Sequence, residues 1–460
     1  MIREVFSPDR TAAAILPRYE LRQEESYRPS VFLFPFRHGE SAFAYHTLSK
    51  QCLQVDEDLF DALGTGRHFS GGELCASGEL TRLLSQRFLV PEKTDETGCY
   101  ADMMRLLRLR ALRKRMNSYT ILTTTACNAR CFYCVEEGAP ILTMDDGTAR
   151  DTVDFILRSR DPGKPVHLTW FGGEPLAAAR VIDRVSAALT QAGVDFDAGM
   201  VSNGILIDRE SLEKMTGLWR IRRIQISLDG EEKEYNRRKN YRHPYPSAYR
   251  LVLEVLRQLS DTGIRLAIRC NVDGDNAEGL RLMVDDLART IRNKANVGLY
   301  FAVLFARRNS QEHTELLRRC LEAKLYAREK GFPYAALNSL HSLRIMHCGA
   351  ENPTGSAVVF PDGALFNCYR FLPEMQTGDL KAGLDRKDYV NSFALPDPVR
   401  ESCRDCCFLP VCTSFSRCPN EVEQCRETRE LELLYDLRCE LDRRERGSVS
   451  RGEDAPDLLC

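Results

Sequence analysis

The sequence predicts an α/β fold whose centre, residues 116–310, is a partial (β/α)6 barrel. Two observations lead to this prediction. Six short apolar runs have the residue types of buried strands, and segments with helical periodicity, such as Ala248–Leu259 and Leu280–Ile291, separate them. Strands that alternate with helices are typical of a parallel sheet, in which the loops after the carboxyl ends of the strands carry the chemistry. The expected strands are Tyr119–Thr124, Val166–Phe171, Ala198–Ser202, Arg223–Leu228, Arg265–Cys270 and Val297–Leu304.

Residues 28–100 predict a separate, winged-helix-like domain. Apolar residues that alternate with polar ones indicate short strands at Phe32–Phe36, Ala42–Tyr45 and Gln51–Val55, and two amphipathic helical segments follow them. A β-ribbon followed by helices is compatible with a winged helix. The basic stretch Arg105–Arg115 comes next, and we interpret it as a solvated linker helix.

The part of the chain after the barrel is expected to be less regular. Residues 311–345 predict a helical connector, and residues 346–440 are rich in cysteine, with a turn signal at Pro361–Gly363 and a helix expected at Thr428–Leu441. Residues 441–460 are charged and contain glycine and serine, so we expect a disordered tail.

Composition narrows the partners that this chain can have. Its 460 residues are too many for one hydrophobic core, and its 64 basic and 66 acidic residues nearly balance. This balance gives no reason to expect a nucleic-acid or membrane partner. No apolar run approaches the length of a membrane helix, and the first residues, MIREVFSPDR, lack the pattern of a secretory signal. We therefore expect a cytoplasmic protein.

The cysteines are the most informative residues. The chain has 18, and many are clustered, which in a cytoplasmic protein indicates metal or iron–sulfur ligands rather than disulfides. Cys127, Cys131 and Cys134 have the spacing C-x3-C-x2-C directly after the first expected strand. Three thiolates on one tight loop can hold three irons of a cubane cluster and leave the fourth iron open to a substrate or cofactor. A zinc site would more often show two CxxC pairs.

This loop and the segment after the second expected strand resemble the radical S-adenosylmethionine (SAM) superfamily. That segment reads Trp170-Phe171-Gly172-Gly173-Glu174-Pro175, which is similar to the superfamily's GGE motif. The resemblance implies that the segment contacts the amino group of SAM, because two glycines let backbone carbonyls approach an ammonium and Glu174 supplies charge.

Two later segments, Ser202-Asn203-Gly204 and Ser227-Leu228-Asp229-Gly230, end the third and fourth expected strands and resemble family segments that line the cofactor site. The resemblance implies that Ser227 binds the carboxylate of SAM, and we add Arg269 as a second candidate. It also implies that a [4Fe-4S] cluster reduces bound SAM and yields a 5′-deoxyadenosyl radical that takes hydrogen from an unactivated C–H bond. No residue is identified as a catalytic acid or base.

The C-terminal cysteines resemble a SPASM extension, which houses auxiliary iron–sulfur clusters in peptide- and protein-modifying radical enzymes. The spacing departs from the usual pattern in the gap before Cys418 and in the additional Cys407. The resemblance implies one or two auxiliary [4Fe-4S] clusters. One would be held by Cys403, Cys406, Cys412 and Cys425, and the other by Cys348, Cys368 and Cys418. Cys439 is a reserve ligand on the expected helix, and a four-thiolate zinc site is the alternative for this region.

Residues 28–95 resemble the peptide-recognition element of enzymes that modify ribosomally synthesised peptides. The resemblance implies that this domain binds the leader of a precursor peptide as an added β-strand, and so raises the effective concentration of the core peptide at the barrel. A generic dimerisation or structural domain is the alternative. The expected partners are this precursor peptide and an electron donor of the flavodoxin or ferredoxin type.

Together these features predict a radical SAM peptide maturase, a peptide-modifying oxidoreductase that forms a thioether between a peptide cysteine and an unactivated carbon. Carbon–carbon crosslinking of a peptide is a close alternative. A maturase of a folded protein, such as the anaerobic sulfatase-activating type, is another, although it needs no leader-binding domain. A non-catalytic iron–sulfur electron carrier has no use for the open three-thiol loop or for the GGE and SLDG segments. A zinc-binding interaction protein would be colourless when purified without oxygen, whereas iron–sulfur clusters absorb at about 400 nm.

Overall fold

The computed structural model describes residues 2–111, 115–304, 311–333, 340–343, 345, 355–368, 375–385, 399, 401–412 and 426–445. Backbone contacts divide the chain into two compact units. The barrel unit comprises the described residues of Leu109–Ala335 and Cys348–Leu395. The N-terminal unit comprises the described residues of Met1–Arg108, Ala336–His347 and Pro396–Ala455.

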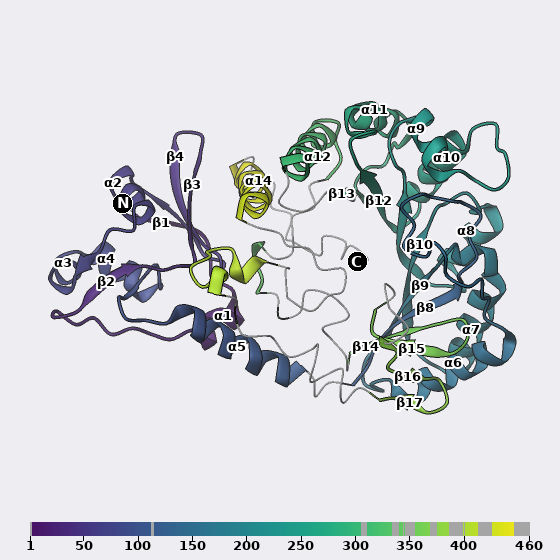
Figure 1. Ribbon diagram of the computed structural model, residues 1–460, viewed down its shortest axis with the longest axis horizontal. Helices are drawn as coiled ribbons and strands as arrows, with labels where there is room; N and C mark the ends of the chain where they lie inside the picture. The colour runs from purple at the N-terminus through teal and green to yellow at the C-terminus, as the bar shows by residue number, and fades with distance from the viewer. Residues whose placement is uncertain are drawn as a thin grey trace. The chain divides into compact units, whose positions relative to one another are not determined.

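The barrel unit is built on six parallel strands in the order β13-β12-β11-β10-β9-β8 (Figure 1). Strands adjacent in sequence are therefore adjacent in the sheet, as repeated strand–helix units require. All six lie where the sequence predicts strands, so the predicted parallel barrel of α/β class is confirmed. Their bounds are Ser118–Thr124 for β8, Val166–Gly172 for β9, Phe196–Ser202 for β10, Ile221–Ser227 for β11, Arg265–Val272 for β12 and Val297–Val303 for β13.

Amphipathic helices cover the outer side of this curved sheet (Figure 1). In α10, the buried residues Val252, Leu256 and Leu259 recur at helical spacing, and the Ser247 hydroxyl caps the first turn by accepting a hydrogen bond from the Arg250 amide. Among the described helices, none has both the length and the apolar character needed to cross a membrane. The bounds are Asp146–Ser159 for α6, Ala179–Gln191 for α7, Arg209–Thr216 for α8, Glu232–Lys239 for α9, Ala248–Ser260 for α10, Leu280–Thr290 for α11 and Gln311–Glu329 for α12.

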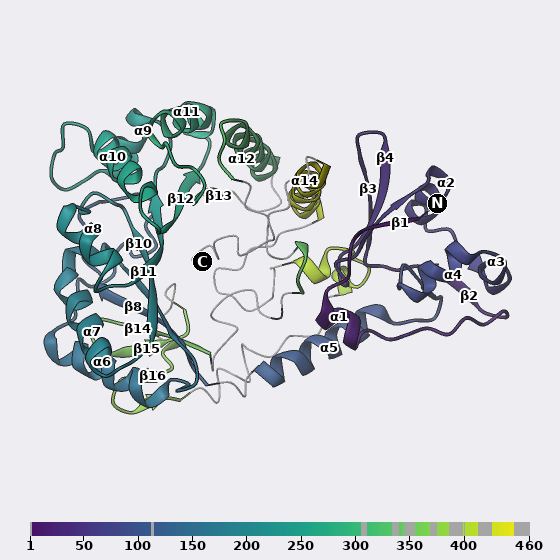
Figure 2. The same cartoon turned by 180° about the vertical axis from the view of Figure 1, so that it is seen from behind.

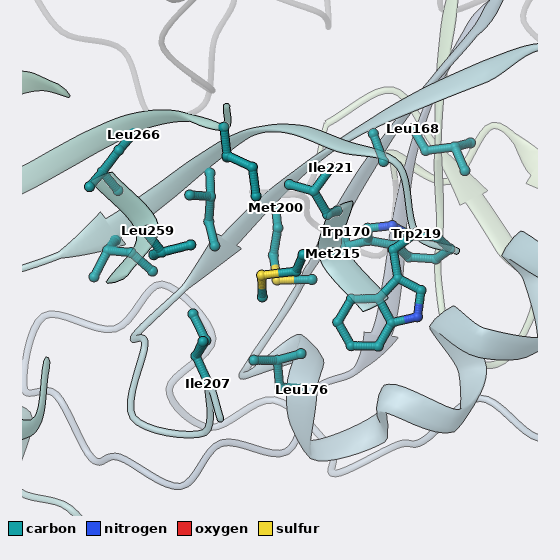
Figure 3. Close-up of a cluster of buried hydrophobic side chains, with 14 of the residues drawn as sticks. Leu168, Trp170, Leu176, Met200, Ile207, Met215, Trp219, Ile221, Leu259 and Leu266 are labelled. Carbon is teal, nitrogen blue, oxygen red and sulfur yellow. The ribbon is translucent and has the colours of Figure 1, made fainter. Parts of the chain in front are cut away.

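The core of the barrel unit lies between the sheet and these helices. The side chains of Trp170 and Trp219 are almost fully buried there, beside Met200 and Met215 (Figure 3). The indole of Trp219 donates a hydrogen bond to Asp183 Oδ1 at 2.8 Å, so its one polar atom is satisfied. Because the chain has only two tryptophans, its tryptophan fluorescence reports on the barrel unit alone.

A later part of the chain extends the same sheet beyond β8 (Figure 2). Strand β14 (Ser356–Val359) pairs parallel to β8, and β15 (Ala364–Phe366), β16 (Gly378–Asp379) and β17 (Gly383–Leu384) follow in antiparallel order. This addition covers an edge strand that would otherwise present unpaired backbone groups. The expectation that residues after 346 are irregular is wrong for this segment.

The N-terminal unit contains two small antiparallel sheets, ordered β1-β5-β4-β3 and β6-β2-β7. It starts at Arg3, well before the predicted start at residue 28, but it has the expected succession of short strands followed by helices. Its strands are β1 (Arg3–Phe6), β2 (Ser26–Pro29), β3 (Leu33–His38), β4 (Ser41–His46), β5 (Cys52–Val55), β6 (Phe69–Ser70) and β7 (Leu89–Pro91). Its helices are α1 (Arg10–Ile15), α2 (Glu57–Gly64), α3 (Gly71–Ala76), α4 (Gly78–Ser85) and α5 (Glu96–Ala111).

The C-terminal segment of the chain completes the core of the N-terminal unit. Phe34, Phe36 and Tyr45 of the first sheet pack against Phe408 and against Leu437 of helix α14, whose bounds are Arg426–Glu445. The residues of α14 after 440 are therefore helical and not disordered, and those after 445 lie outside the described residues. The predicted division into five domains stays a prediction, and the contacts place the residues around Cys403 with the N-terminal sheet.

Candidate functional site

Three thiols lie on one loop at the carboxyl end of β8. Cys127 and Cys131 are half-buried and Cys134 is exposed. A turn joins the last two, because the Cys134 amide donates to the Cys131 carbonyl at 3.0 Å. The predicted cluster loop thus stands at the end of the parallel sheet where barrel enzymes carry their chemistry.

Two glycines at the end of β9 let its backbone pack closely against this loop. A Cβ on Gly172 would lie 2.1 Å from the Thr124 carbonyl oxygen, and one on Gly173 would lie 2.4 Å from the Ala126 carbonyl oxygen. The Gly173 amide instead donates to Thr124 at 3.0 Å. The GGE segment therefore needs glycine for close packing under the chain that leads into Cys127, a role that the sequence analysis did not foresee.

Glu174 joins β9 to β10. Its carboxylate is fully buried and accepts hydrogen bonds from the Asn203 amide at 2.8 Å and from the Ser202 hydroxyl at 2.8 Å, and the Leu176 amide donates to it at 3.2 Å. These three donors fix the carboxylate in place. Contact of Glu174 with the amino group of SAM remains a prediction.

Burial raises the pKa of the Glu174 carboxyl from 4.5 to about 6. The folded protein therefore binds this proton more tightly than the unfolded chain, so its contribution to stability is complete below pH 4.5 and is lost as the pH rises through about 6. Glu174→Gln should remove about 2 kcal/mol of pH dependence from the free energy of unfolding over this interval. Urea unfolding of iron-free protein, followed by tryptophan fluorescence, measures this; a variant with the wild-type slope would contradict the assignment.

The end of β10 also reaches the cysteine loop. The Asn203 side-chain amide donates to Asn128 Oδ1 at 2.7 Å and lies 4.0 Å from Cys127 Sγ. Glu174 and Asn203 thus connect the ends of three consecutive strands around Cys127. The structure therefore brings Gly172, Gly173, Glu174, Ser202 and Asn203 together at one end of the sheet, and their contact with SAM stays a prediction.

Ser227 and Arg269 lie side by side on β11 and β12, where they are paired in register. The Arg269 guanidinium donates to Asn271 Oδ1 at 3.0 Å and lies 5.7 Å from the centre of the Tyr300 ring. These contacts give Arg269 a structural role on its own strand pair, and its contact with SAM stays a prediction. Ser227 instead accepts a hydrogen bond from Lys239 Nζ at 2.7 Å.

Sequence reasoning missed the partners of Ser227. Lys239, Asp229 and Tyr133 form a buried group beside it, with the Lys239 ammonium 2.8 Å from Asp229 Oδ2 and 3.0 Å from the Tyr133 hydroxyl. Asp229 lies within the SLDG segment and Tyr133 directly precedes the third cysteine, so both could have been inferred from the motifs. Nothing in the sequence pattern distinguishes Lys239 from its neighbours Arg237 and Arg238.

The residues of the cysteine loop fit an iron–sulfur cluster. Three thiols supply the soft donors that iron requires. The Asn128 side-chain nitrogen is a buried donor without a partner among the described residues, as expected of a loop that packs against an anionic group. Burial raises the pKa of the Cys127 thiol to about 11 and also raises that of Cys134, so metal binding must displace their protons.

The C-terminal cysteines fall into two places. Cys368 follows β15 in the barrel unit, whereas Cys403, Cys406 and Cys412 lie half-buried in the N-terminal unit. The segment that carries these three has two 3-10 helices, Glu401–Cys403 and Leu409–Val411. The other predicted auxiliary ligands, Cys348, Cys418 and Cys425, lie outside the described residues. The division of ligands between two clusters stays a prediction.

Cys407 is a core residue by its surroundings. It is buried in the cluster that includes Phe34 and Phe408, and its carbonyl accepts a hydrogen bond from Thr47 Oγ1 at 2.5 Å. Cys439 is likewise buried, on α14. Both differ from the half-buried Cys406, so we expect neither to be a ligand.

This contrast gives a direct test. If Cys406 is one of four ligands of an auxiliary [4Fe-4S] cluster, Cys406→Ala should lower the iron content of anaerobically reconstituted protein by about one atom per chain or more, because three thiols remain for the other irons. Cys407→Ala should keep the iron and lower stability by about 1 kcal/mol through a lost core contact. Iron analysis and thermal unfolding of the two variants measure these outcomes, and loss of iron on Cys407→Ala would contradict the assignment.

Comparison with known proteins agrees with this geometry. Residues 121–287 match the family model of the Radical SAM superfamily. A curated relative, GTP 3′,8-cyclase of Chlorobaculum tepidum, is 32% identical over 90 residues, which cover 20% of this chain and 26% of that protein. The same enzyme of Nostoc punctiforme is 34% identical over 106 residues, or 22% of this chain and 31% of that one. The chain thus spans about a third or less of these relatives.

Solved structures share the fold. That of histidine-tagged anSMEcpe with bound AdoMet matches with a TM-score of 0.55 at 14% identity, over 72% of this chain and 94% of that one. Native anSMEcpe with bound AdoMet and the Cp18Cys peptide matches with a TM-score of 0.53 at 16% identity, over 72% and 98%. At these identities the likeness concerns the fold.

Proposed function

Because residues 121–287 form a radical SAM domain, we propose that this enzyme is a peptide maturase that binds SAM and a [4Fe-4S] cluster at the carboxyl ends of β8 to β12. The observation that carries the proposal is the convergence of the three-thiol loop with Glu174, Asn203 and Ser227 at one end of the sheet. When bound, the cluster supplies the electron that splits SAM into methionine and a 5′-deoxyadenosyl radical.

The residues of the chain have separate tasks in this proposal. Cys127, Cys131 and Cys134 hold the cluster. The Ser227 hydroxyl, at the end of β11, donates to the carboxylate of SAM. Glu174 keeps Asn203 against the cysteine loop, so that the ends of β9 and β10 stay in register with the bound cluster.

We propose a precursor peptide as the substrate, because the N-terminal unit has a small sheet whose edge can accept a strand. Edge strand β3 is a poor acceptor, since Pro35 removes a backbone donor from it. The opposite edge is β1, which pairs with β5, contains no proline and has Arg3 and Glu4 exposed. Each edge receives one hydrogen bond from α14, since Arg438 donates to the Arg37 carbonyl at 3.4 Å and Arg444 donates to the Val5 carbonyl at 2.8 Å. The leader peptide therefore adds on the β1 side of the sheet. The fold likeness to anSMEcpe, solved with the Cp18Cys peptide, also supports a peptide substrate.

Formation of a thioether is the reaction we favour, with auxiliary clusters held by the C-terminal cysteines and an electron donor of the flavodoxin or ferredoxin type. The new carbon–sulfur bond replaces one C–H and one S–H bond, so the product peptide is lighter by two hydrogen atoms. The 5′-deoxyadenosyl radical would take one of them, and the other would leave as a proton to water and an electron to a bound iron–sulfur cluster. Reduced protein should therefore release 5′-deoxyadenosine from SAM and lower the mass of the precursor peptide by this amount. Alkylation of the product with iodoacetamide separates thioether formation, which consumes the thiol, from a carbon–carbon crosslink, which does not.

A further inference from the structure

A buried charged group links the cysteine loop to the end of β11. The Lys239 side chain is 3% exposed and Asp229 is fully buried, with 2.8 Å between Nζ and Oδ2. Lys239 Nζ also donates to Ser227 Oγ at 2.7 Å and to the Tyr133 hydroxyl at 3.0 Å. All three N–H groups of the ammonium are therefore used, which is what keeping a charge in the interior requires.

Both oxygens of the Asp229 carboxylate also have hydrogen-bond donors. Asp229 Oδ1 accepts from the backbone amide of Asn271 at 2.8 Å and from its side-chain amide at 2.9 Å. Asp229 Oδ2 accepts from Lys239 and from the Tyr133 hydroxyl. Lys239 and Asp229 thus balance each other in charge and hold each other in one orientation.

The Ser227 hydroxyl is the member of this group that can donate a hydrogen bond to a ligand outside it. Because Ser227 Oγ accepts from Lys239, its own proton must point in another direction, and no acceptor for that proton is present among the described residues. Ser227 is half-buried at the carboxyl end of β11. An O–H whose oxygen already accepts from an ammonium is a strengthened donor, which suits an anionic ligand such as a carboxylate.

The backbone of Lys239 also holds the cysteine loop. Its carbonyl accepts from the Arg130 amide at 3.0 Å and lies 4.0 Å from Cys131 Sγ. Further along, the chain binds the loop again, where the Arg242 amide donates to the Asn128 carbonyl at 2.8 Å. Asn240, with a φ of 44°, turns the chain between these two contacts.

From this geometry we infer that Lys239 is a positioning residue, which sets the Ser227 hydroxyl as a donor to the carboxylate of SAM and holds that donor at a fixed place relative to the cysteine loop. The inference rests on the proposed function. Lys239 has no N–H left for SAM, so it acts on SAM only through Ser227.

A double-mutant cycle tests the inference on anaerobically reconstituted protein. Ser227→Ala and Lys239→Gln should each weaken SAM binding roughly 10- to 100-fold, the usual effect of losing a hydrogen bond to a charged group. The affinity of the double variant for SAM should equal that of whichever single variant binds SAM less tightly, because both changes remove the same contact. Calorimetry gives the affinities, and the change in the cluster's electron paramagnetic resonance spectrum on adding SAM provides a second readout. Losses that multiply in the double variant would overturn the inference.

Matched variants separate positioning from folding. Lys214→Gln changes a partly exposed lysine of the same unit, which is paired with Asp183 and Glu210, and should leave SAM affinity unchanged. If the Lys239→Gln variant loses its iron, it is replaced in the test by the double variant Lys239→Gln/Asp229→Asn, which lacks both members of the buried ion pair. It should keep its iron and tryptophan fluorescence and show the same loss of SAM affinity. Wild-type SAM affinity in this pair would overturn the inference, whereas a wild-type protein that binds no SAM would overturn the proposed function itself.

Discussion

Replacing Cys131 with alanine is expected to abolish SAM cleavage. Cys131 lies between the other two thiols on the loop after β8, and each thiolate of such a loop holds a separate iron. Two remaining protein ligands cannot hold the cluster in place, so the release of 5′-deoxyadenosine from SAM should fall to the level of iron-free protein. Chromatography of anaerobic reactions with dithionite measures this product.

Two exposed cysteines outside the loop are controls for this variant. Cys75 and Cys99 belong to the N-terminal unit. Alanine at either position should leave cleavage at the wild-type rate, so a general effect of losing a thiol would be recognised. If Cys131→Ala cleaves SAM as fast as the wild type does, the three-thiol loop is not the cluster site and the proposed chemistry is wrong.

Removing the leader from the precursor peptide is expected to lower kcat/KM for peptide modification by about 10²- to 10⁴-fold. A leader bound to the N-terminal unit makes the encounter of the core peptide with the barrel intramolecular, and linked binding of this kind provides gains of that order. Cleavage of SAM without peptide should be unchanged. Mass spectrometry of the peptide and chromatography of 5′-deoxyadenosine follow the two reactions in one sample.

Hydrogen exchange with the isolated leader locates its binding edge. Addition on the β1 side should protect amides of Arg3–Phe6 and leave those of β3 unchanged, because Pro35 removes a backbone donor from the β3 edge. Protection of β3 instead would contradict the assigned edge. Equal turnover of peptides with and without the leader would favour a maturase that does not use the N-terminal unit for recognition.

Sequence patterns predicted the elements that contain long apolar runs. The six strands of the barrel are predictable because each has at least two buried apolar side chains within a short apolar run, as β10 does with Ala198 and Met200. Strands β16 and β17 have two residues each and were missed, since no periodicity exists at that length. β1 was missed for a similar reason, because only Phe6 of its four residues is buried.

In the candidate site, too, some residues are predictable from the sequence and others are not. Spacing identifies Cys127, Cys131 and Cys134, and the resemblance to the radical SAM superfamily points to the motif glycines. Lys239 could not be predicted, because its importance depends on a contact with Ser227 that forms only when α9 folds back onto the end of β11. The packing of Gly172 beneath Thr124 likewise depends on two strands that are 48 positions apart in the sequence.

The pairing of the first sheet with α14 affects how the protein is made. The aromatic face of β3 and β4 is covered only when Phe408 and Leu437 have been synthesised, near the opposite end of the chain. A ribosome adds about 5–20 residues per second, so this exposed aromatic surface stays uncovered for roughly 20 seconds or more after it leaves the exit tunnel. Chaperones that shield nascent chains should therefore bind this region.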